Sequence, residues 1–159
     1  MQRPVTNIVI AGLGGQGVLT ASDIVADVAF DAGLDVKKSE VHGMSQRGGS
    51  VASDVRFGKQ VFSPMVPRGE AGFLVVTDSG QVPVNEDYLA KDGVLIEPSQ
   101  VDETKLVSKK GINVALLGVL SRHLEFSPEA WLAAIQRNFP ETLYEANQKA
   151  FFLGRNEGS

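Results

Sequence analysis

Asn7-Ile8-Val9-Ile10-Ala11-Gly12-Leu13-Gly14-Gly15-Gln16-Gly17 is the stretch of this sequence that decides its fold. Its first half is a short apolar run and its second half is rich in glycine. Helical periodicity follows at once, because apolar residues between 21 and 32 fall on one face while Asp23, Asp27 and Asp31 recur every four residues on another. The stretch therefore predicts a strand, a tight turn and an amphipathic helix, which is how many α/β folds begin.

The rest of the chain predicts more strands and helices, with no internal repeat or linker. Extended segments are expected at residues 34–41, 51–57, 73–77 and 94–97, with a possible short edge strand at 105–107. Helices are expected at 85–91, at 114–120 after Asn113 as cap, from a Ser127 cap onward, and at 143–153. The pair Gly58-Lys59 before residues 60–62 predicts a β-hairpin. We expect a three-layer α/β/α fold with a mixed, mostly parallel sheet, forming a single domain over residues 1–154, and a flexible tail at 155–159.

Composition excludes several classes of protein. The chain has 159 residues, no cysteine and a net charge of −4. The absence of cysteine rules out disulfides and Cys-ligated zinc or iron–sulfur clusters in this chain. No apolar run is long enough to span a bilayer, and the N-terminal residues lack the pattern of a signal peptide, so we expect a cytoplasmic protein with no membrane partner. The acidic balance argues against nucleic acid as a partner.

A second glycine-rich segment runs Glu40-Val41-His42-Gly43-Met44-Ser45-Gln46-Arg47-Gly48-Gly49-Ser50. It combines a cation, an imidazole, an amide and two hydroxyls with three glycines. Such a composition suits a loop that offers hydrogen bonds and close backbone approach to a ligand. Packing alone would not call for it.

The first glycine loop has two open interpretations. Gly12, Gly14 and Gly17 satisfy the G-x-G-x-x-G spacing of a dinucleotide-binding turn, with Glu40 as the acid that would bind a ribose. Residues 35–40 are mostly polar, whereas the second strand of a dinucleotide-binding fold is buried on both faces and apolar. The alternative is that the glycines only allow the helix to pack tightly on the strand.

Together, the two loops resemble the gamma subunit or domain of the 2-oxoacid:ferredoxin oxidoreductases, and most closely the beta subunit of indolepyruvate oxidoreductases. The motifs that carry the resemblance are residues 12–17 and 39–51. It continues through Phe62-Ser63-Pro64, the apolar helix after Asn113, Phe139-Pro140 and residues 145–151, and so covers almost the whole chain.

The resemblance implies a subunit that is inactive alone. With its partners it would help to convert a 2-oxoacid of the aryl pyruvate class and coenzyme A to an acyl-CoA, carbon dioxide and electrons. Thiamine diphosphate with magnesium and the iron–sulfur clusters that serve ferredoxin are implied in partner subunits, and coenzyme A at a shared site. The implied binding residues are Gly12, Gly14, Gly15, Gln16, Gly17, Glu40, His42, Ser45, Gln46, Arg47, Gly48 and Gly49.

Residue chemistry suggests roles for some of these groups. Arg47, Lys37, Lys38 and the amides that open the first helix are the positive features suited to the phosphates of coenzyme A. Gln16, Ser45 and Gln46 are suited to the pantetheine arm, and His42 is the one possible catalytic residue, as a hydrogen-bond donor or proton carrier near the thiol.

Two alternatives to a coenzyme A site stay open. His42 and Arg47 would also serve to pin the loop internally or against a partner, which would make the chain a scaffold subunit. The other is a free-standing dinucleotide-binding protein. The segment Asp78-Ser79-Gly80-Gln81-Val82-Pro83 departs from the family, whose members tend to begin a glutamate-containing helix there. This departure puts the local helix and the exact substrate in question.

Overall fold

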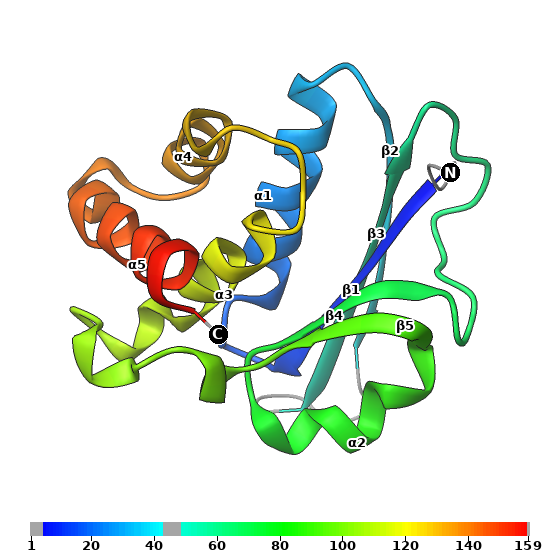
Figure 1. Ribbon diagram of the computed structural model, residues 1–159, viewed down its shortest axis with the longest axis horizontal. Coiled ribbons are helices and arrows are strands. Elements are labelled where there is room, and N and C mark those ends of the chain that lie inside the picture. Colours follow the sequence, from blue (N-terminus) through cyan, green and yellow to red (C-terminus); the bar gives the residue numbers. More distant parts are fainter. Residues whose placement is uncertain (1–4, 43–48, 159) are drawn as a thin grey trace.

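The computed structural model of the chain describes residues 5–42 and 49–158, and has a sheet flanked by helices (Figure 1). The strands are β1 (Val5–Leu13), β2 (Asp35–His42), β3 (Ser50–Gly58), β4 (Ala71–Val76) and β5 (Leu89–Ile96). The helices are α1 (Val18–Asp31), α2 (Val82–Asn85), α3 (Ile112–Ser121), α4 (Pro128–Arg137) and α5 (Tyr144–Glu157). Short 3-10 turns lie at Ser79–Gln81, Glu86–Tyr88, Pro98–Gln100, Glu103–Lys105, Lys109–Gly111 and Glu141–Leu143.

The five strands form one sheet in the order β2-β3-β1-β4-β5. β4 is parallel to both β1 and β5, whereas β3 is antiparallel to both β1 and β2. β3 therefore runs opposite to the other four strands. The predicted α/β fold with a mixed, mostly parallel sheet is confirmed.

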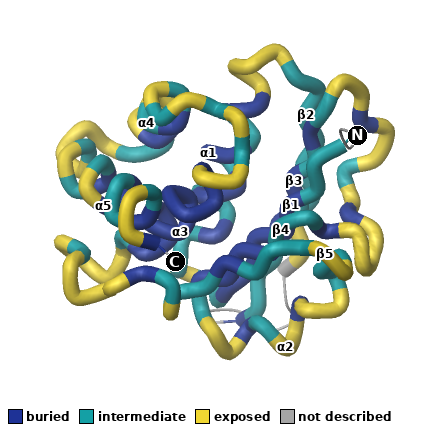
Figure 2. Tube along the Cα trace, viewed as in Figure 1, coloured by how far each residue is buried: buried dark blue, intermediate teal, exposed yellow. Residues whose placement is uncertain are grey.

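The two faces of the sheet are covered unequally. On one face, Ile8 and Ile10 of β1 pack against α1, α3, α4 and α5 in the larger apolar core. Alternate residues Val9 and Ala11 face the other side, where a smaller core includes Val66 and a contact with Val82 of α2. Figures 1 and 2 show the four longer helices on one side of the buried strands and α2 on the other. The third layer of the expected fold is thus only a four-residue helix and a loop.

The predicted hairpin at Gly58-Lys59 is wrong. β3 ends at Gly58, and both of its partners in the sheet, β1 and β2, precede it in the sequence. Residues 60–62 form no strand. The mixed sheet arises instead because β3 is inserted, antiparallel, between β2 and β1.

Residues 59–70, which we call the strap, cross the second face of the sheet between β3 and β4. Three side chains of the sheet bind its backbone: Asp35 accepts from Val61 N–H (2.8 Å), Arg56 donates to Ser63 C=O (2.8 Å) and Asp54 accepts from Val66 N–H (2.9 Å). Burial raises the pKa of the Asp54 carboxyl above its usual range, and the bond from Val66 N–H and the charge of Arg56 oppose that shift. Side chains of the sheet therefore fix the backbone of the strap at three of its residues.

The helical half differs from the sequence prediction mainly at its boundaries. α3 begins at Ile112 with Gly111 as its N-cap residue, so Asn113 does not cap the helix. Ser127 caps α4 as predicted, since its hydroxyl accepts from Ala130 N–H at 3.1 Å. The possible strand at 105–107 is absent from the described sheet, and α5 continues through Glu157, where the sequence predicted a tail from 155.

No helix in the described ranges is both long enough and apolar enough to cross a membrane.

Candidate functional site

The candidate site lies at the carboxyl ends of β1 and β4. The glycine loop at residues 14–17 follows β1, and the turn that begins at Asp78 follows β4. The start of β3 and the start of α3 reach the same end of the molecule, through contacts described below. In open α/β sheets, ligands bind at this end of the strands.

The two glycine loops of the sequence are in direct contact. Gly14 N–H donates to Gly49 C=O at 2.9 Å, and Leu13 pairs with Ser50 across β1 and β3. Sequence reasoning had linked these loops only through a resemblance. Gly49, the residue directly before β3, is thus hydrogen-bonded to the glycine loop that precedes α1.

Gly15 and Gly17 both adopt left-handed backbone conformations, with φ of +90° and +76°. Gly15 is exposed, and a Cβ placed there would meet no atom within 4 Å. At Gly17 a Cβ would lie 2.3 Å from the side-chain nitrogen, Nδ2, of Asn113. Both positions therefore favour glycine on conformational grounds, and Gly17 also because of space.

Gln16 is hydrogen-bonded within the protein, and its role in orienting a pantetheine arm stays a prediction. Its Oε1 accepts from Leu13 N–H at 2.8 Å and from the Thr77 hydroxyl at 2.8 Å. Its Nε2 lies 3.4 Å from a carboxylate oxygen of Asp78. Gln16 therefore ties the glycine loop to the end of β4, and Gly12 allows this because a Cβ there would lie 1.9 Å from Thr77 Oγ1.

Asn113 is a site residue that sequence reasoning misassigned. Its side-chain nitrogen donates to Gly17 C=O at 3.2 Å, which attaches α3 to the loop before α1. The residue is 4% exposed and lies in a helix that is otherwise almost wholly apolar. A single buried amide in an apolar helix could have indicated this contact from the sequence, because buried polar groups need hydrogen-bond partners.

The lysines near the loops are already paired with acids. Lys38 contacts Asp23 of α1 and lies 3.6 Å from Glu40, while Lys37 lies 3.9 Å from Asp35. These pairs are partly exposed and individually weak. They nevertheless partly neutralise the positive charge that Lys37 and Lys38 were expected to offer to a phosphate. Glu40 is likewise paired, with Lys38 of the same strand.

The position of β2 argues against a dinucleotide site. In the dinucleotide-binding fold the strand that carries the ribose-binding acid lies beside the first strand and parallel to it. Here β3 separates β2 from β1, which places Glu40 two strands away, roughly 10 Å. β2 is an edge strand, and this explains why residues 35–40 are mostly polar.

Part of the predicted site falls outside the described residues. Ser45, Gln46, Arg47 and Gly48 belong to it, as does the side chain of His42, which is the last residue of β2 and pairs with Val51 through its backbone. In the described part of the chain, no group of three or more His, Asp or Glu side chains is arranged to hold a metal ion.

Residues 7–104 match the family model for pyruvate ferredoxin/flavodoxin oxidoreductase. The chain belongs to this family. It is 35% identical to the indolepyruvate oxidoreductase subunit IorB of Thermococcus kodakarensis, over 93% of each chain, and equally similar over the same shares to that of Pyrococcus horikoshii. The pyruvate synthase subunit PorC of Methanothermobacter thermautotrophicus is 27% identical over 92% of each chain. Family members that resemble this chain are thus subunits of 2-oxoacid oxidoreductases, as the two glycine loops indicated.

Solved structures of the family share the fold. The pyruvate oxidoreductase subunit PORC of Thermotoga maritima superimposes with a TM-score of 0.80 at 22% identity, over 99% of this chain and 98% of that one. A 2-oxoglutarate:ferredoxin oxidoreductase from Magnetococcus marinus, solved with 2-oxoglutarate, coenzyme A and succinyl-CoA bound, also gives a TM-score of 0.80 at 17% identity. The match covers 97% of this chain but only 31% of that one.

Proposed function

We propose that this chain is the non-redox, gamma-type subunit of a thiamine-dependent 2-oxoacid:ferredoxin oxidoreductase that acts on indolepyruvate or another aryl pyruvate in the cytoplasm. Its role is to help bind coenzyme A and to complete an active site that it shares with a partner subunit. The observation that carries the proposal is the Gly14–Gly49 hydrogen bond, which brings both family motifs to the ligand-binding end of the sheet. The similarity to IorB favours indolepyruvate among the 2-oxoacids.

The chain contributes positioning to this chemistry. Thiamine diphosphate with magnesium supplies the carbon chemistry, and iron–sulfur clusters take the electrons to ferredoxin; both belong to partner subunits in this proposal. The clasp of Gln16, Thr77 and Asp78 holds the first loop on the end of β4, so that the backbone of Gly15 stays exposed and the amides that open α1 keep their direction. Those amides favour an anionic group.

Arg47 becomes the main cation of the proposed coenzyme A site. Lys37 and Lys38 are paired with acids, whereas Arg47 lies in the second motif and is suited to binding phosphate oxygens in pairs. His42 is proposed to donate a hydrogen bond or carry a proton near the thiol. Glu40, Ser45, Gln46, Gly48 and Gly49 complete the proposed surface.

Steady-state kinetics of the assembled complex test this role. Arg47→Ala should raise the KM for coenzyme A by about tenfold or more, because a charged hydrogen bond to phosphate contributes about 1.5–3 kcal/mol. The KM for the 2-oxoacid should stay near the wild-type value, and the subunits should still co-elute. Unchanged coenzyme A kinetics would show that the loop has a scaffold role instead.

Titration of the isolated chain with NAD(H) tests the rival function. The separation of β2 from β1 predicts no saturable binding. Tight binding that Glu40→Ala weakens would replace the proposed function with that of a dinucleotide-binding protein.

A further inference from the structure

A broad groove lies at the opposite end of the sheet from the glycine loops. Its floor is the helix-facing side of four neighbouring strands near the amino ends of β1 and β4, with Thr6, Phe57, Phe73 and Val94 as lining residues. One wall is the connection between α3 and α4, residues 122–127. The groove has a volume of about 1320 Å³. We call it the amino-end groove.

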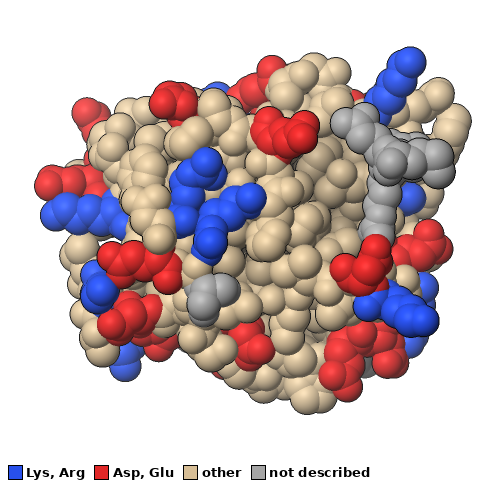
Figure 3. Space-filling view, viewed as in Figure 1, with Lys and Arg blue, Asp and Glu red and all other residues tan. Residues whose placement is uncertain are grey.

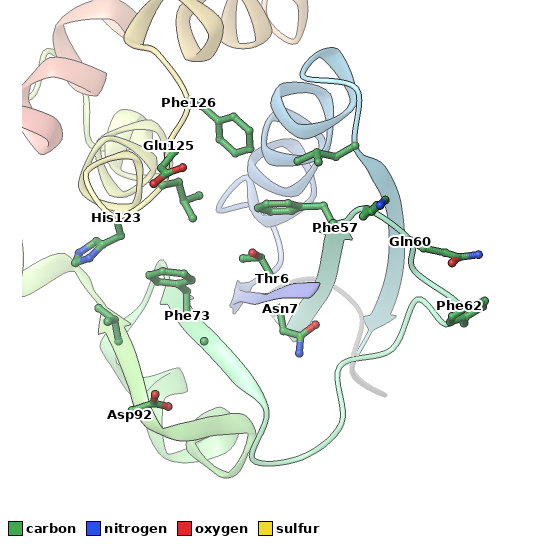
Figure 4. Close-up of a pocket in the computed structure, with 16 residues that line it drawn as sticks. Thr6, Asn7, Phe57, Gln60, Phe62, Phe73, Asp92, His123, Glu125 and Phe126 are labelled. Carbon is green, nitrogen blue, oxygen red and sulfur yellow. The ribbon is translucent and has the colours of Figure 1, made fainter. Parts of the chain in front are cut away.

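Aromatic side chains surround this groove. The Phe57 and Phe126 rings lie 5.7 Å apart, and the Phe73 ring lies 5.6 Å from that of His123. Figure 4 shows these four rings near one another and Phe62 well apart from them on the strap, although Phe62 also lines the groove. Figure 3, in the orientation of Figure 1, shows a largely uncharged area in the middle of this face with charged side chains around it.

Phe62 is held in an exposed position. Its side chain is 83% exposed, the highest value among the large hydrophobic residues of the described chain. The neighbouring strap residues Val61 and Val66 are each 3% exposed, and side chains of the sheet bind the strap backbone on both sides of Phe62. Because these bonds hold the backbone on both sides of Phe62, this segment has little backbone freedom to lose on binding, which favours a role for the exposed ring as an anchor in a protein interface.

We propose that the amino-end groove and Phe62 form a docking surface for one segment of the thiamine-type partner subunit, a segment that carries a large apolar side chain next to a lysine or arginine. This inference rests on the proposed function, because that function supplies the partner. The surface is separate from the candidate active-site edge, so it would give the partner subunit a second contact, at the opposite end of the sheet from the shared active site.

The size and place of the groove favour a protein segment over a metabolite. Small-molecule sites usually enclose about 300–1,000 Å³ and, in open α/β sheets, lie at the carboxyl ends of the strands. This groove is larger than that range, open to one side and at the amino ends.

The lysine or arginine of the proposed partner segment is inferred from the charge of the groove wall. The charged residues that line the groove are two acids, Asp92 and Glu125, and one lysine, Lys59, so its lining is acidic on balance. Glu125 stands exposed on the groove wall and forms no ion pair with the described residues. The chain as a whole is acidic, with a net charge of −4. A basic side chain beside the apolar one would therefore complement this wall and speed association.

The test is the dissociation constant between this chain and the purified partner subunit, measured by calorimetry at two salt concentrations. Phe62→Ala should weaken binding by about tenfold or more, and Glu125→Lys by about threefold to tenfold with a larger effect at low salt. Phe30→Ala and Glu103→Lys are matched controls. Phe30 is 71% exposed on α1 and Glu103 is exposed on a 3-10 turn, both outside the groove, and each change should alter binding less than about twofold.

The outcomes separate the inference from the function on which it rests. If the wild-type chain binds the partner and both groove variants bind equally well, the docking surface is overturned while the proposed function stands. If the wild-type chain binds no thiamine-type subunit, both are overturned. Sedimentation velocity of the isolated chain supplies the remaining test, because a homodimer that Phe62→Ala dissociates would make a second copy the occupant and overturn the proposed partner.

Discussion

Replacing Gly12 by alanine should disrupt the junction between β1 and β4, and removing the Thr77 hydroxyl as well should restore part of it. A Cβ at Gly12 would lie 1.9 Å from Thr77 Oγ1, 2.9 Å from Val18 Cγ2 and 3.0 Å from Gln16 Oε1. The first distance is too short for any pair of non-bonded heavy atoms. Thr77 must therefore move, and its hydrogen bond to Gln16 is lost.

The expected energies follow from these contacts. Overpacking costs about 1–3 kcal/mol and a lost hydrogen bond about 1 kcal/mol, so Gly12→Ala should lower the free energy of unfolding by roughly 2–4 kcal/mol. Thr77→Ala alone should cost about 1 kcal/mol. In the double variant the clash with Oγ1 is gone, and its loss of stability should be smaller than the sum by about 1–2 kcal/mol. The contact with Val18 keeps the rescue partial.

Urea denaturation, followed by tryptophan fluorescence, measures the free energies of unfolding of the wild type, the two single variants and the double variant, which together form a double-mutant cycle. Trp131 is the one tryptophan of the sequence and is 0% exposed, so its emission reports loss of the core. If the two single effects add within about 0.5 kcal/mol, Gly12 and Thr77 do not pack against each other, and the clasp between the glycine loop and β4 would be refuted.

Three further predictions concern the stability of the fold. Gly154→Ala should destabilise by about 2 kcal/mol or more, because a Cβ would lie 1.7 Å from the Ala115 carbonyl oxygen, and this outweighs a gain of about 1 kcal/mol in helix propensity. Gly111→Ala, whose Cβ would meet its nearest neighbour at 3.5 Å, is the control, and equal urea midpoints for the two variants would contradict close packing of α3 on α5. Because burial raises the folded-state pKa of Asp54 above 3.8, ionised Asp54 lowers stability at neutral pH, and this cost is relieved as the pH falls through the folded pKa. Asp54→Asn should therefore gain stability relative to wild type at pH 7, by a margin that shrinks toward pH 4 in unfolding curves; a margin independent of pH would contradict this. Ser127→Ala should cost about 1 kcal/mol of unfolding free energy through loss of the N-cap of α4, and an unchanged value would contradict the cap.

The first strand, turn and helix were predictable because their signals are local. Residues 7–11 are apolar, glycines follow, and the helix repeats every three to four residues, so hydrophobic periodicity alone identifies β1 and α1. Ser127 was predictable for the same reason, since a capping hydroxyl acts within three residues of itself.

Pairing between distant segments was not predictable from these signals. The glycine after Phe57 is a common hairpin signal, yet β3 pairs with β1 and β2, whose residues precede it. Period-two alternation gives the faces of a strand but not its neighbours. The edge position of β2, which removes the dinucleotide interpretation, depends on that same pairing.

The candidate site was predictable in place but not in all its contacts. Both glycine loops were identified, and the structure joins them through Gly14 and Gly49. An amide in a glycine loop can serve a ligand or the protein, and the bonds of Gln16 to Leu13 and Thr77 could not be predicted because Thr77 lies far away in the sequence. Asn113 was assigned to a helix cap because its true partner, Gly17, lies 96 residues away in the sequence.

Reconstitution of the complex tests the central claim most directly. The purified thiamine-type subunit is mixed with increasing amounts of this chain, and the coenzyme A-dependent oxidation of indolepyruvate is followed with ferredoxin as acceptor. The account predicts that neither protein is active alone and that activity rises to saturation as this chain is added. Full activity of the partner subunit without this chain would contradict it.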